Sequence, residues 1–403
     1  MRFALALVAG LIGTGLIALR AQAAEDPATV SRGAYLTRVG NCAGCHTAPG
    51  GADFAGGLHL ASPYGTFITP NITPDRTTGI GDWSKQDFWH ALHDGQRADG
   101  APLYPACPYP SFTHVSRDDV DAIHAYLQSV PAVAQNNADH DLGFPYRLRS
   151  LVNVWQWLYF EPGALPDKPQ QSTTWTRGRY LVEGLGHCNE CHRARGRLGA
   201  LDDADDAPGA MIHGWYAPPL ADPAQAGLQQ WPIDAGADFL TAGKSERATM
   251  MGPMADVVFD SLQYLHDDDA LAMATYLKSI PVQTIASPLR LIRLTENGRQ
   301  DAMNMGRDIY ADHCAECHGD RGEGSDEAPA LAGNRAVTMD NPVNVANMIR
   351  SGGFAAATRG NPRPHGMPPF YDFDDRELAA VITYIRGSWG NDAAPVTGTN
   401  LKR

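Results

Sequence analysis

The chain has 403 residues, a formal net charge of −13 and seven cysteines. So acidic a protein is a poor nucleic-acid binder, because contacts to phosphates need clustered Lys and Arg. A chain of this length normally forms two or three domains.

The first 23 residues have the pattern of an export leader. Arg2 is followed by an apolar run, and the small residues Ala21 and Ala23 precede a cleavage point before Ala24. The pattern predicts a secretory signal peptide over 1–23. A retained N-terminal anchor helix is the alternative, although the run is short for a membrane span. Cleavage would remove Arg2 and Arg20 and move the formal charge from −13 to −15.

Six of the seven cysteines form three copies of one motif: CAGCH (42–46), CNECH (188–192) and CAECH (314–318). Cys-x-x-Cys-His is the signature of covalent haem c attachment, since one helical turn places two thiols for thioether bonds and the His under the iron. Zinc sites and redox disulfides also use Cys-x-x-Cys, but three copies with a trailing His favour three covalently bound haems c. The predicted attachment residues are Cys42, Cys45, Cys188, Cys191, Cys314 and Cys317, and the predicted iron ligands are His46, His192 and His318.

The repeat extends beyond the cysteines. Each motif follows an amphipathic segment containing Gly (RGAYLTRVG, RGRYLVEGLG, MGRDIYADH), and each repeat closes with an acidic helix start and aromatics. This arrangement resembles the cytochrome c fold three times over. We therefore expect an all-α protein of three tandem cytochrome c-like domains with long loops, over 24–165 (unit 1), 166–290 (unit 2) and 291–403 (unit 3). The opening and closing helices of a unit are expected to cross, with Tyr35 near Tyr126 and Tyr180 near Tyr276.

A Pro-x-aliphatic element follows each motif, at Pro70, Pro218 and Pro329. In cytochromes c such a proline offers its carbonyl to the proximal imidazole, so the resemblance implies that these prolines orient the motif histidines. The alternative is an ordinary turn proline.

A sixth iron ligand is needed for a six-coordinate haem, and Met is common in electron carriers. Unit 3 offers Met367 in HGMPPF, and unit 2 offers Met254 in TMMGPMADVV, with Met250 and Met251 as competitors. Any of these could instead fill the core.

Unit 1 has no Met, because none occurs between Met1 and Met211. Cys107 stands 61 residues after His46, and its PACPY context resembles the PAMPY loop of related haem units. We therefore predict Cys107 as the distal ligand of the first haem, where a thiolate would lower the potential. In the alternative, Cys107 only fills the space of a Met, and the iron is five-coordinate or bound by a histidine: His59, His90, His93 or His114.

Long stretches resemble one family: TPNITPDRTTGIGDWSKQDFWHALHDG, RGRYLVEGLGHCNECH, GPMADVVFDSLQYL and MPPFYDFDDRELAAVITYIRGSWGN. They are similar to the triheme cytochrome c subunit of bacterial membrane-associated periplasmic dehydrogenases, which oxidise alcohols, aldehydes, gluconate, fructose or related sugars. The resemblance implies a large catalytic subunit carrying flavin, pyrroloquinoline quinone or a molybdenum cofactor, and electron flow through the haems to ubiquinone. It also implies a periplasmic location on the outer face of the cytoplasmic membrane. The chain ends soon after unit 3, so we expect attachment through a partner or a small surface patch.

No Ser-His-Asp order, phosphate loop or nicotinamide fingerprint occurs in a convincing context, so substrate oxidation is expected on another chain. Two alternatives remain: a haem enzyme of the peroxidase or thiosulfate dehydrogenase type, and a free-standing electron shuttle. The aromatic-rich segment 149–160 is expected to form a helix packed between units 1 and 2, or else a membrane or partner surface.

Overall fold

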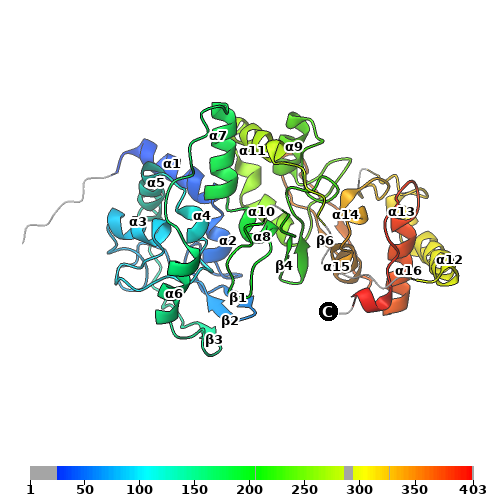
Figure 1. The fold of residues 1–403 in the computed structure, drawn as a ribbon, viewed down its shortest axis with the longest axis horizontal. Helices are drawn as coiled ribbons and strands as arrows, with labels where there is room; N and C mark the ends of the chain where they lie inside the picture. Colours follow the sequence, from blue (N-terminus) through cyan, green and yellow to red (C-terminus); the bar gives the residue numbers. More distant parts are fainter. Residues whose placement is uncertain (1–24, 205, 286–293, 326, 402–403) are drawn as a thin grey trace, which may run out of the picture.

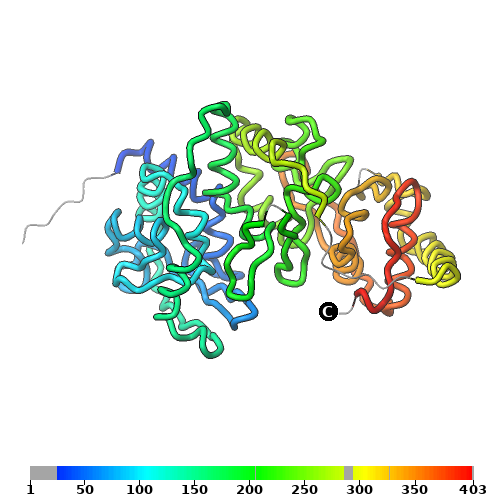
Figure 2. The backbone as a smooth tube through the Cα atoms, viewed as in Figure 1, coloured from blue at the N-terminus to red at the C-terminus, as the bar shows by residue number. Residues whose placement is uncertain are grey.

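The computed structural model describes residues 25–204, 206–285, 294–325 and 327–401, so the predicted signal peptide lies outside the described residues. In these ranges the chain is mostly helical, with a group of helices around each Cys-x-x-Cys-His motif (Figure 1). Figure 2 shows these groups following one another along the long axis, with unit 3 at the end opposite the N-terminus. None of the helices in the described ranges is both long and apolar enough to cross a bilayer.

Unit 1 carries its motif between two long helices that pack against each other, α1 and α5. Ser116 caps α5 by accepting the backbone N–H of Asp119, and two aspartates in the first turn favour the positive end of the helix dipole. The elements are α1 (Pro27–Val39), α2 (Cys42–His46), β1 (His59–Ser62), β2 (Gly65–Ile68), α3 (Lys85–His93), α4 (Tyr109–Phe112), α5 (Arg117–Leu127), β3 (Asp141–Leu142) and α6 (Ser150–Tyr159).

Units 2 and 3 repeat this plan, with α7 packed on α11 and α12 packed on α16. Unit 2 comprises α7 (Thr173–Arg179), the π-helical turn η1 (Tyr180–Leu185), α8 (Asn189–His192), β4 (Ala210–Ile212), β5 (Trp215–Ala217), α9 (Ile233–Ala242), α10 (Pro253–Asp260), the 3-10 turn η2 (Leu262–Tyr264) and α11 (Asp267–Ser279). Unit 3 comprises α12 (Glu296–His313), α13 (Ala315–His318), α14 (Arg335–Thr338), α15 (Val343–Ser351), β6 (Gly353–Phe354), β7 (Gly366–Met367), α16 (Asp375–Arg386) and the 3-10 turn η3 (Gly398–Leu401).

One glycine in each opening helix makes the crossing possible. A Cβ atom on Gly33 would lie 1.9 Å from the carbonyl oxygen of Ala122, and one on Gly178 would lie 1.9 Å from that of Ala272. In unit 3 a Cβ on Gly306 would lie 2.1 Å from the carbonyl oxygen of the residue at 380. The helices therefore approach backbone to backbone, and only glycine fits at the contact.

The long loops contain short antiparallel pairings that the all-α expectation did not include. In unit 1, β1 pairs with β2 and β2 with β3. Unit 2 has the β4–β5 hairpin, and unit 3 has the two-residue β6–β7 pair. The prediction of a mostly helical cytochrome c-like chain is confirmed, and the strands are local features of its loops.

A single hydrophobic core runs through units 1 and 2 and includes Ala356 of unit 3, while the rest of unit 3 packs around its own core. The first contains Leu36 and Ile123 from unit 1 together with Leu181 and Met273 from unit 2. The second lies around α12, α15 and α16 and includes Ile382. Units 1 and 2 are therefore expected to unfold together.

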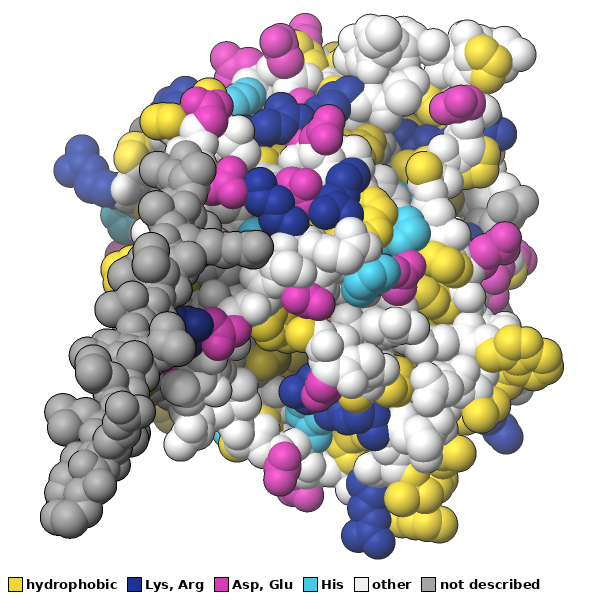
Figure 3. All heavy atoms as spheres, turned by 90° about the vertical axis from the view of Figure 1, so that its left-hand side faces the viewer, with side chains coloured by type: hydrophobic (Ala, Val, Ile, Leu, Met, Phe, Trp, Pro, Cys, Tyr) yellow, Lys and Arg dark blue, Asp and Glu magenta, His cyan; other side chains and the backbone are white. Residues whose placement is uncertain are grey.

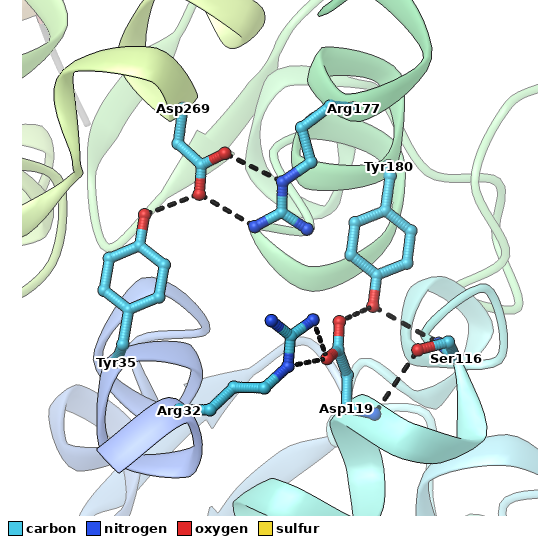
Figure 4. Close-up of polar contacts among 7 residues, drawn as sticks. All are labelled: Arg32, Tyr35, Ser116, Asp119, Arg177, Tyr180 and Asp269. Carbon is cyan, nitrogen blue, oxygen red and sulfur yellow. Dashed lines mark hydrogen bonds and ion pairs between the residues drawn. The ribbon is translucent and has the colours of Figure 1, made fainter. Parts of the chain in front are cut away.

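Two polar clusters join units 1 and 2 (Figure 4). In the first, Tyr35 of unit 1 donates its hydroxyl to Asp269 of unit 2 at 2.6 Å. Arg177 donates to both oxygens of the same carboxylate, each at 2.8 Å. The Tyr35 ring also stacks on His266, with ring centres 3.9 Å apart. The buried carboxylate of Asp269 is thus held by donors from both units.

The second cluster also consists of a tyrosine, an arginine and an aspartate, but here the tyrosine comes from unit 2 and the other two residues from unit 1. Tyr180 of unit 2 donates to Asp119 of unit 1 at 2.6 Å, and Arg32 donates to that carboxylate at 2.7 Å. The two tyrosines, expected to pack within their own units, thus place their hydroxyls on the neighbouring unit (Figure 4). The joint is reciprocal.

The joint between units 2 and 3 uses amides in place of the buried carboxylates. The Asn344 side chain of α15 accepts the backbone N–H of Tyr216 and donates to its carbonyl, both at 2.8 Å. Tyr216 also packs with Ala336 and Met339 in a small apolar cluster. Arg335 donates to the carbonyl of Gly227 at 2.6 Å. Among the described residues every recorded ion pair lies within one unit, so hydrogen bonds and apolar packing make the contacts between units.

Candidate haem sites

Each Cys-x-x-Cys-His motif occupies a single helical turn. In unit 1 the whole motif is helical, as α2, while α8 and α13 begin one residue after the first cysteine of their motifs. None of the six motif cysteines forms a disulfide with another described residue. Burial raises the pKa of Cys42 and Cys188 to about 12 and that of Cys314 to about 11. Such surroundings suit neutral sulfur, as in a thiol or a thioether.

Each motif histidine is oriented by the proline that follows its motif. His46 Nδ1 lies 2.8 Å from the carbonyl oxygen of Pro70. The same contact measures 2.7 Å in unit 2 and 2.9 Å in unit 3, between the pairs His192–Pro218 and His318–Pro329. Because a carbonyl only accepts, each Nδ1 carries the proton, which leaves the Nε2 lone pair for a metal.

The protonation of these histidines fits the same role. Burial lowers the pKa of His46, His192 and His318, and the hydrogen bond to the proline carbonyl partly offsets that effect. The rings are therefore neutral near pH 7, as metal ligands must be. The donor set of two thiols, one neutral imidazole and a fixed tautomer fits haem c at all three motifs.

The loops of units 1 and 2 that carry the sixth-ligand candidates are built alike. Leu103 donates its backbone N–H to the carbonyl of Gly95 at 2.7 Å, and Met250 donates to that of Gly243 at 2.8 Å. Four residues beyond these donors stand Cys107 and Met254. Cys107 therefore holds the place in unit 1 that Met254 holds in unit 2.

The competitors of Met254 have other contacts. Met250 occupies the position of Leu103 in the loop and packs against the shared core. Met251 packs against the small cluster between units 2 and 3. Met254 also packs against the shared core, in the first turn of α10. Met250 and Met254 share the core contact, so it is the loop position matching Cys107 that favours Met254 as the ligand of unit 2.

Met367 lies in β7, where it pairs with Gly353 of β6. Its side chain is half-buried and packs against the core of unit 3, which also contacts Cys314 of the motif. Met367 and the attachment site therefore pack against the same apolar core.

Cys107 lies beside the attachment site of unit 1. Burial raises the pKa of the Cys107 thiol to about 12, and the neighbouring Cys45 raises it further. A thiolate at this position therefore needs a compensating positive charge close by. Ferric iron would supply that charge.

Several of the alternative histidines are already bonded. His90 contacts Asp94 through Nδ1 at 2.5 Å and Gln86 through Nε2 at 2.8 Å, so both ring nitrogens are used. His93 contacts Asp94 at 2.7 Å, and His114 contacts the carbonyl of Gly163 at 2.7 Å. The remaining candidate, His59, is exposed in β1.

The attachment sites of units 1 and 2 face each other. The Cys45 thiol is close enough to Cys191 to raise its pKa, after the larger effects of burial and Glu190. Ser111, four residues after Cys107, donates to Glu190 of the second motif at 2.9 Å. Sequence reasoning missed Glu190. A Glu also stands at the same place in the third motif, where Glu316 is exposed, so the residue type alone does not reveal the buried contact.

Comparison with known proteins agrees with this geometry. The cytochrome c family model matches residues 30–131 and 303–389. The chain is 39% identical to "Alcohol dehydrogenase (quinone), cytochrome c subunit" of Gluconobacter oxydans (strain 621H), over 96% of this chain and 84% of that protein. It is 38% identical to "Gluconate 2-dehydrogenase cytochrome c subunit" of Pantoea cypripedii, over 100% of this chain and 94% of that protein.

The chain belongs to this family of dehydrogenase cytochrome c subunits. A third member, "Fructose dehydrogenase cytochrome subunit" of Gluconobacter japonicus, is 33% identical over 93% of this chain and 82% of its own length. The expected family is therefore confirmed. The family model leaves out unit 2, although the cytochrome c geometry of motif, histidine and proline carbonyl recurs there.

Proposed function

We propose that this chain is the electron-transfer subunit of a periplasmic dehydrogenase attached to the cytoplasmic membrane. It carries three haems c and takes electrons from a large catalytic subunit that contains flavin, pyrroloquinoline quinone or a molybdenum cofactor. The electrons pass to ubiquinone, and the substrate is an alcohol or an aldehyde. The threefold recurrence of a motif histidine bonded to a proline carbonyl carries this proposal.

Haem c, when bound, supplies a one-electron iron couple. Cys42 and Cys45 and their counterparts would hold the group covalently, and the histidine, whose ring the proline carbonyl fixes, would be an iron ligand. Fixed ligands let the charge on the iron change with little rearrangement, and burial keeps the surroundings weakly polar. Met254 and Met367 are the proposed distal ligands in units 2 and 3.

The distal ligand of unit 1 is proposed to be Cys107. The residue occupies the loop position that Met254 holds in unit 2, beside the motif thiols. A thiolate stabilises ferric iron more than a thioether does, so this haem should have the lowest potential of the three. Cys107→Met should raise one potential and change one component of the visible spectrum, and the potentials of units 2 and 3 should stay as they were. Unaltered spectra and potentials in Cys107→Met and Cys107→Ala would remove Cys107 from the ligand set.

Units 1 and 2 are proposed to exchange electrons directly, because their attachment sites are adjacent. Their thiols interact electrostatically, and the Ser111–Glu190 hydrogen bond ties the distal loop of one unit to the motif of the other. Rapid exchange needs short distances between haem edges, and the nearness of Cys45 to Cys191 supports such an arrangement.

The test is to purify the chain from its host with any bound protein and to add alcohols, aldehydes, gluconate or fructose. We expect a large cofactor-bearing chain to co-purify, and an alcohol or aldehyde to reduce the haems of the complex. The isolated chain should not turn over these substrates. If no partner co-purifies, the free-standing shuttle is the better description. Turnover of peroxide or thiosulfate by the isolated chain would identify a haem enzyme instead.

A further inference from the structure

The α6 patch is an exposed apolar surface on unit 1 that the electron path does not use. It consists of Phe144, Leu148, Leu151, Val154, Trp157 and Leu158, all of them exposed. Trp157 is 82% exposed and Phe144 is 73% exposed, which is unusual for the largest apolar side chains. Helix α6 was expected either to pack between units 1 and 2 or to form a membrane or partner surface; its inner side packs against both units, and its outer side is exposed.

The inner side of α6 is held firmly. Val152 is buried, and Gln156 donates to the carbonyl of Gly95 at 3.1 Å and to the Tyr109 hydroxyl at 3.3 Å. Trp155 donates its indole N–H to the carbonyl of Leu198 in unit 2 at 2.8 Å. The outer row of apolar side chains is therefore presented by an anchored helix rather than a frayed one.

The outer row has the spacing of one helix face. Leu151, Val154 and Leu158 follow at i, i+3 and i+7, so they lie on one stripe opposite the buried Val152. Phe144 and Leu148 extend this surface from the segment before the helix. In Figure 1, α6 and β3 form the lower edge of unit 1, and Figure 3 shows hydrophobic side chains beside Lys and Arg at the lower part of the face it presents.

The segment that carries the patch is locally positive, although the exposed Asp141 and Glu161 stand directly beside it. Residues 142–160 contain Arg147 and Arg149 and no Asp or Glu, in a chain whose formal charge is −13. Residues 193–199 add three arginines, of which Arg195 pairs with Glu190, and this loop is fixed beside α6 by the Trp155 bond. Arg147 and Arg197 are exposed, and neither forms an ion pair with another described residue.

From this surface we infer that the α6 patch docks onto a bilayer containing anionic lipid. Tryptophan and tyrosine prefer the boundary between headgroups and acyl chains, and arginines beside them attract anionic headgroups. The apolar row is exposed on the outer side of α6, and a fluid bilayer can accept such a surface without a matching groove. An acidic protein partner would match the arginines but leaves the projecting apolar row unexplained.

The inference rests on the proposed function and adds to it which unit meets the membrane. Arg149 donates to the carbonyl of Pro102 at 2.9 Å, and Tyr104 donates to the carbonyl of Tyr146 at 2.9 Å. These bonds tie α6 to the loop that carries Cys107. Docking through α6 therefore places unit 1 at the lipid surface.

The test is flotation of the purified haem-loaded chain with phosphatidylcholine vesicles, with or without phosphatidylglycerol. The triple variant Val154→Ser, Trp157→Ser, Leu158→Ser should lose about tenfold or more of its vesicle binding. The control Val282→Ser, Tyr371→Ser changes two residues that are 57% and 74% exposed on other units, and should bind as the wild type does. All variants share one N-terminus, so any contribution of that end cancels.

A second pair of variants tests the charge. Arg147→Gln and Arg197→Gln should each weaken binding to vesicles with phosphatidylglycerol by about fivefold and leave binding to pure phosphatidylcholine unchanged. Visible spectra and thermal unfolding check that every variant is folded and haem-loaded.

The outcomes separate the membrane surface from other roles. Wild-type protein that ignores both vesicle types, or a triple variant that binds like the control, overturns the inference. A triple variant that binds vesicles normally but no longer assembles with the dehydrogenase makes the patch a protein interface and overturns it too. Failure of the proposed function looks different, because the chain would then bind vesicles but not be reduced by a dehydrogenase.

Discussion

Unit 3 differs from units 1 and 2 at the positions that make the reciprocal joint. Gly33 and Gly178 are preceded by Arg32 and Arg177, whereas Gly306 is preceded by Met305. The tyrosines at 35 and 180 have Asp308 in their place, two residues after the glycine.

The acidic residue at this position also makes different contacts in unit 3. Asp119 and Asp269 bind donors from both units, but the equivalent residue of α16, Glu377, accepts the backbone N–H of Asp374 at 2.9 Å and caps its own helix. Three repeats thus share one internal packing while only two carry the residues for pairing. Internal packing and association between units are specified by different residues, and the two can be perturbed separately.

The largest expected effects come from the helix crossings. Gly178→Ala brings a Cβ within 1.9 Å of a backbone carbonyl and should destabilise the protein by about 3 kcal/mol or more. Because units 1 and 2 share a core, both should melt earlier together. Gly306→Ala should lower only the transition of unit 3. Differential scanning calorimetry of the haem-loaded chain measures this.

A glycine elsewhere serves as the control for the crossings. At Gly236 in α9 an added Cβ would find its nearest neighbour at 3.4 Å, an ordinary contact, so Gly236→Ala should be neutral or slightly stabilising. If Gly306→Ala lowered all transitions together, the independence of unit 3 would be wrong.

The next effect is on the reciprocal joint. Asp269→Asn removes the carboxylate that binds Arg177 and Tyr35, and Asp119→Asn removes its counterpart. Since the Arg177 side chain is 31% exposed, we expect about 2 kcal/mol rather than the full cost of breaking a buried pair. Urea unfolding measures both variants, which should behave alike.

The matched control for the joint lies in unit 3. Asp308→Asn breaks an exposed pair with Arg307 and should change the free energy of unfolding by less than about 0.5 kcal/mol. Equal losses in the joint and control variants would show that the reciprocal clusters contribute nothing special.

A smaller effect is expected from acid. Burial tends to raise the pKa of the Asp269 carboxyl, but hydrogen bonds from Arg177 and Tyr35 lower it overall, with a further contribution from His266. A lowered folded-state pKa gives stability that is present above the unfolded value of about 3.9 and lost as pH falls through the folded value. The unfolding temperature of units 1 and 2 should therefore decrease as the pH is lowered through this range. In Asp269→Asn this part of the pH dependence should vanish, and an unchanged acid profile would contradict the assignment.

The smallest effects come from the hydroxyls. Tyr35→Phe and Tyr180→Phe each remove one hydrogen bond across the joint while the Arg–Asp pairs remain, so each should cost about 1 kcal/mol. Thermal unfolding should show equal losses. Tyr371→Phe, at a residue that is 74% exposed, should show none. A large difference between the two joint variants would count against the reciprocal arrangement.

The sequence predicted what depends on local spacing. The Cys-x-x-Cys-His turns, the proline that follows each motif and the acidic helix starts are all set by residues close together in the chain. The joint was not predictable, because Tyr35 and Asp269 are 234 positions apart and no local pattern in either segment indicates that the two are in contact. The short strands were missed because two to four residues give too little alternation to read.

The helix over 149–160 shows the same limit. Its periodicity predicted a helix, but a row of apolar residues fits a buried face and an exposed face equally well. Only the positions of Gly95, Tyr109 and Leu198 reveal which side is covered. Contacts between segments, rather than residue types, decided the outcome.

The intact mass of the purified chain, together with its iron content, tests the central claim most directly. The account predicts the mass of the polypeptide plus three haem groups, and three irons for each chain. A mass showing fewer bound haems, or iron without porphyrin attached to the motif cysteines, would contradict it.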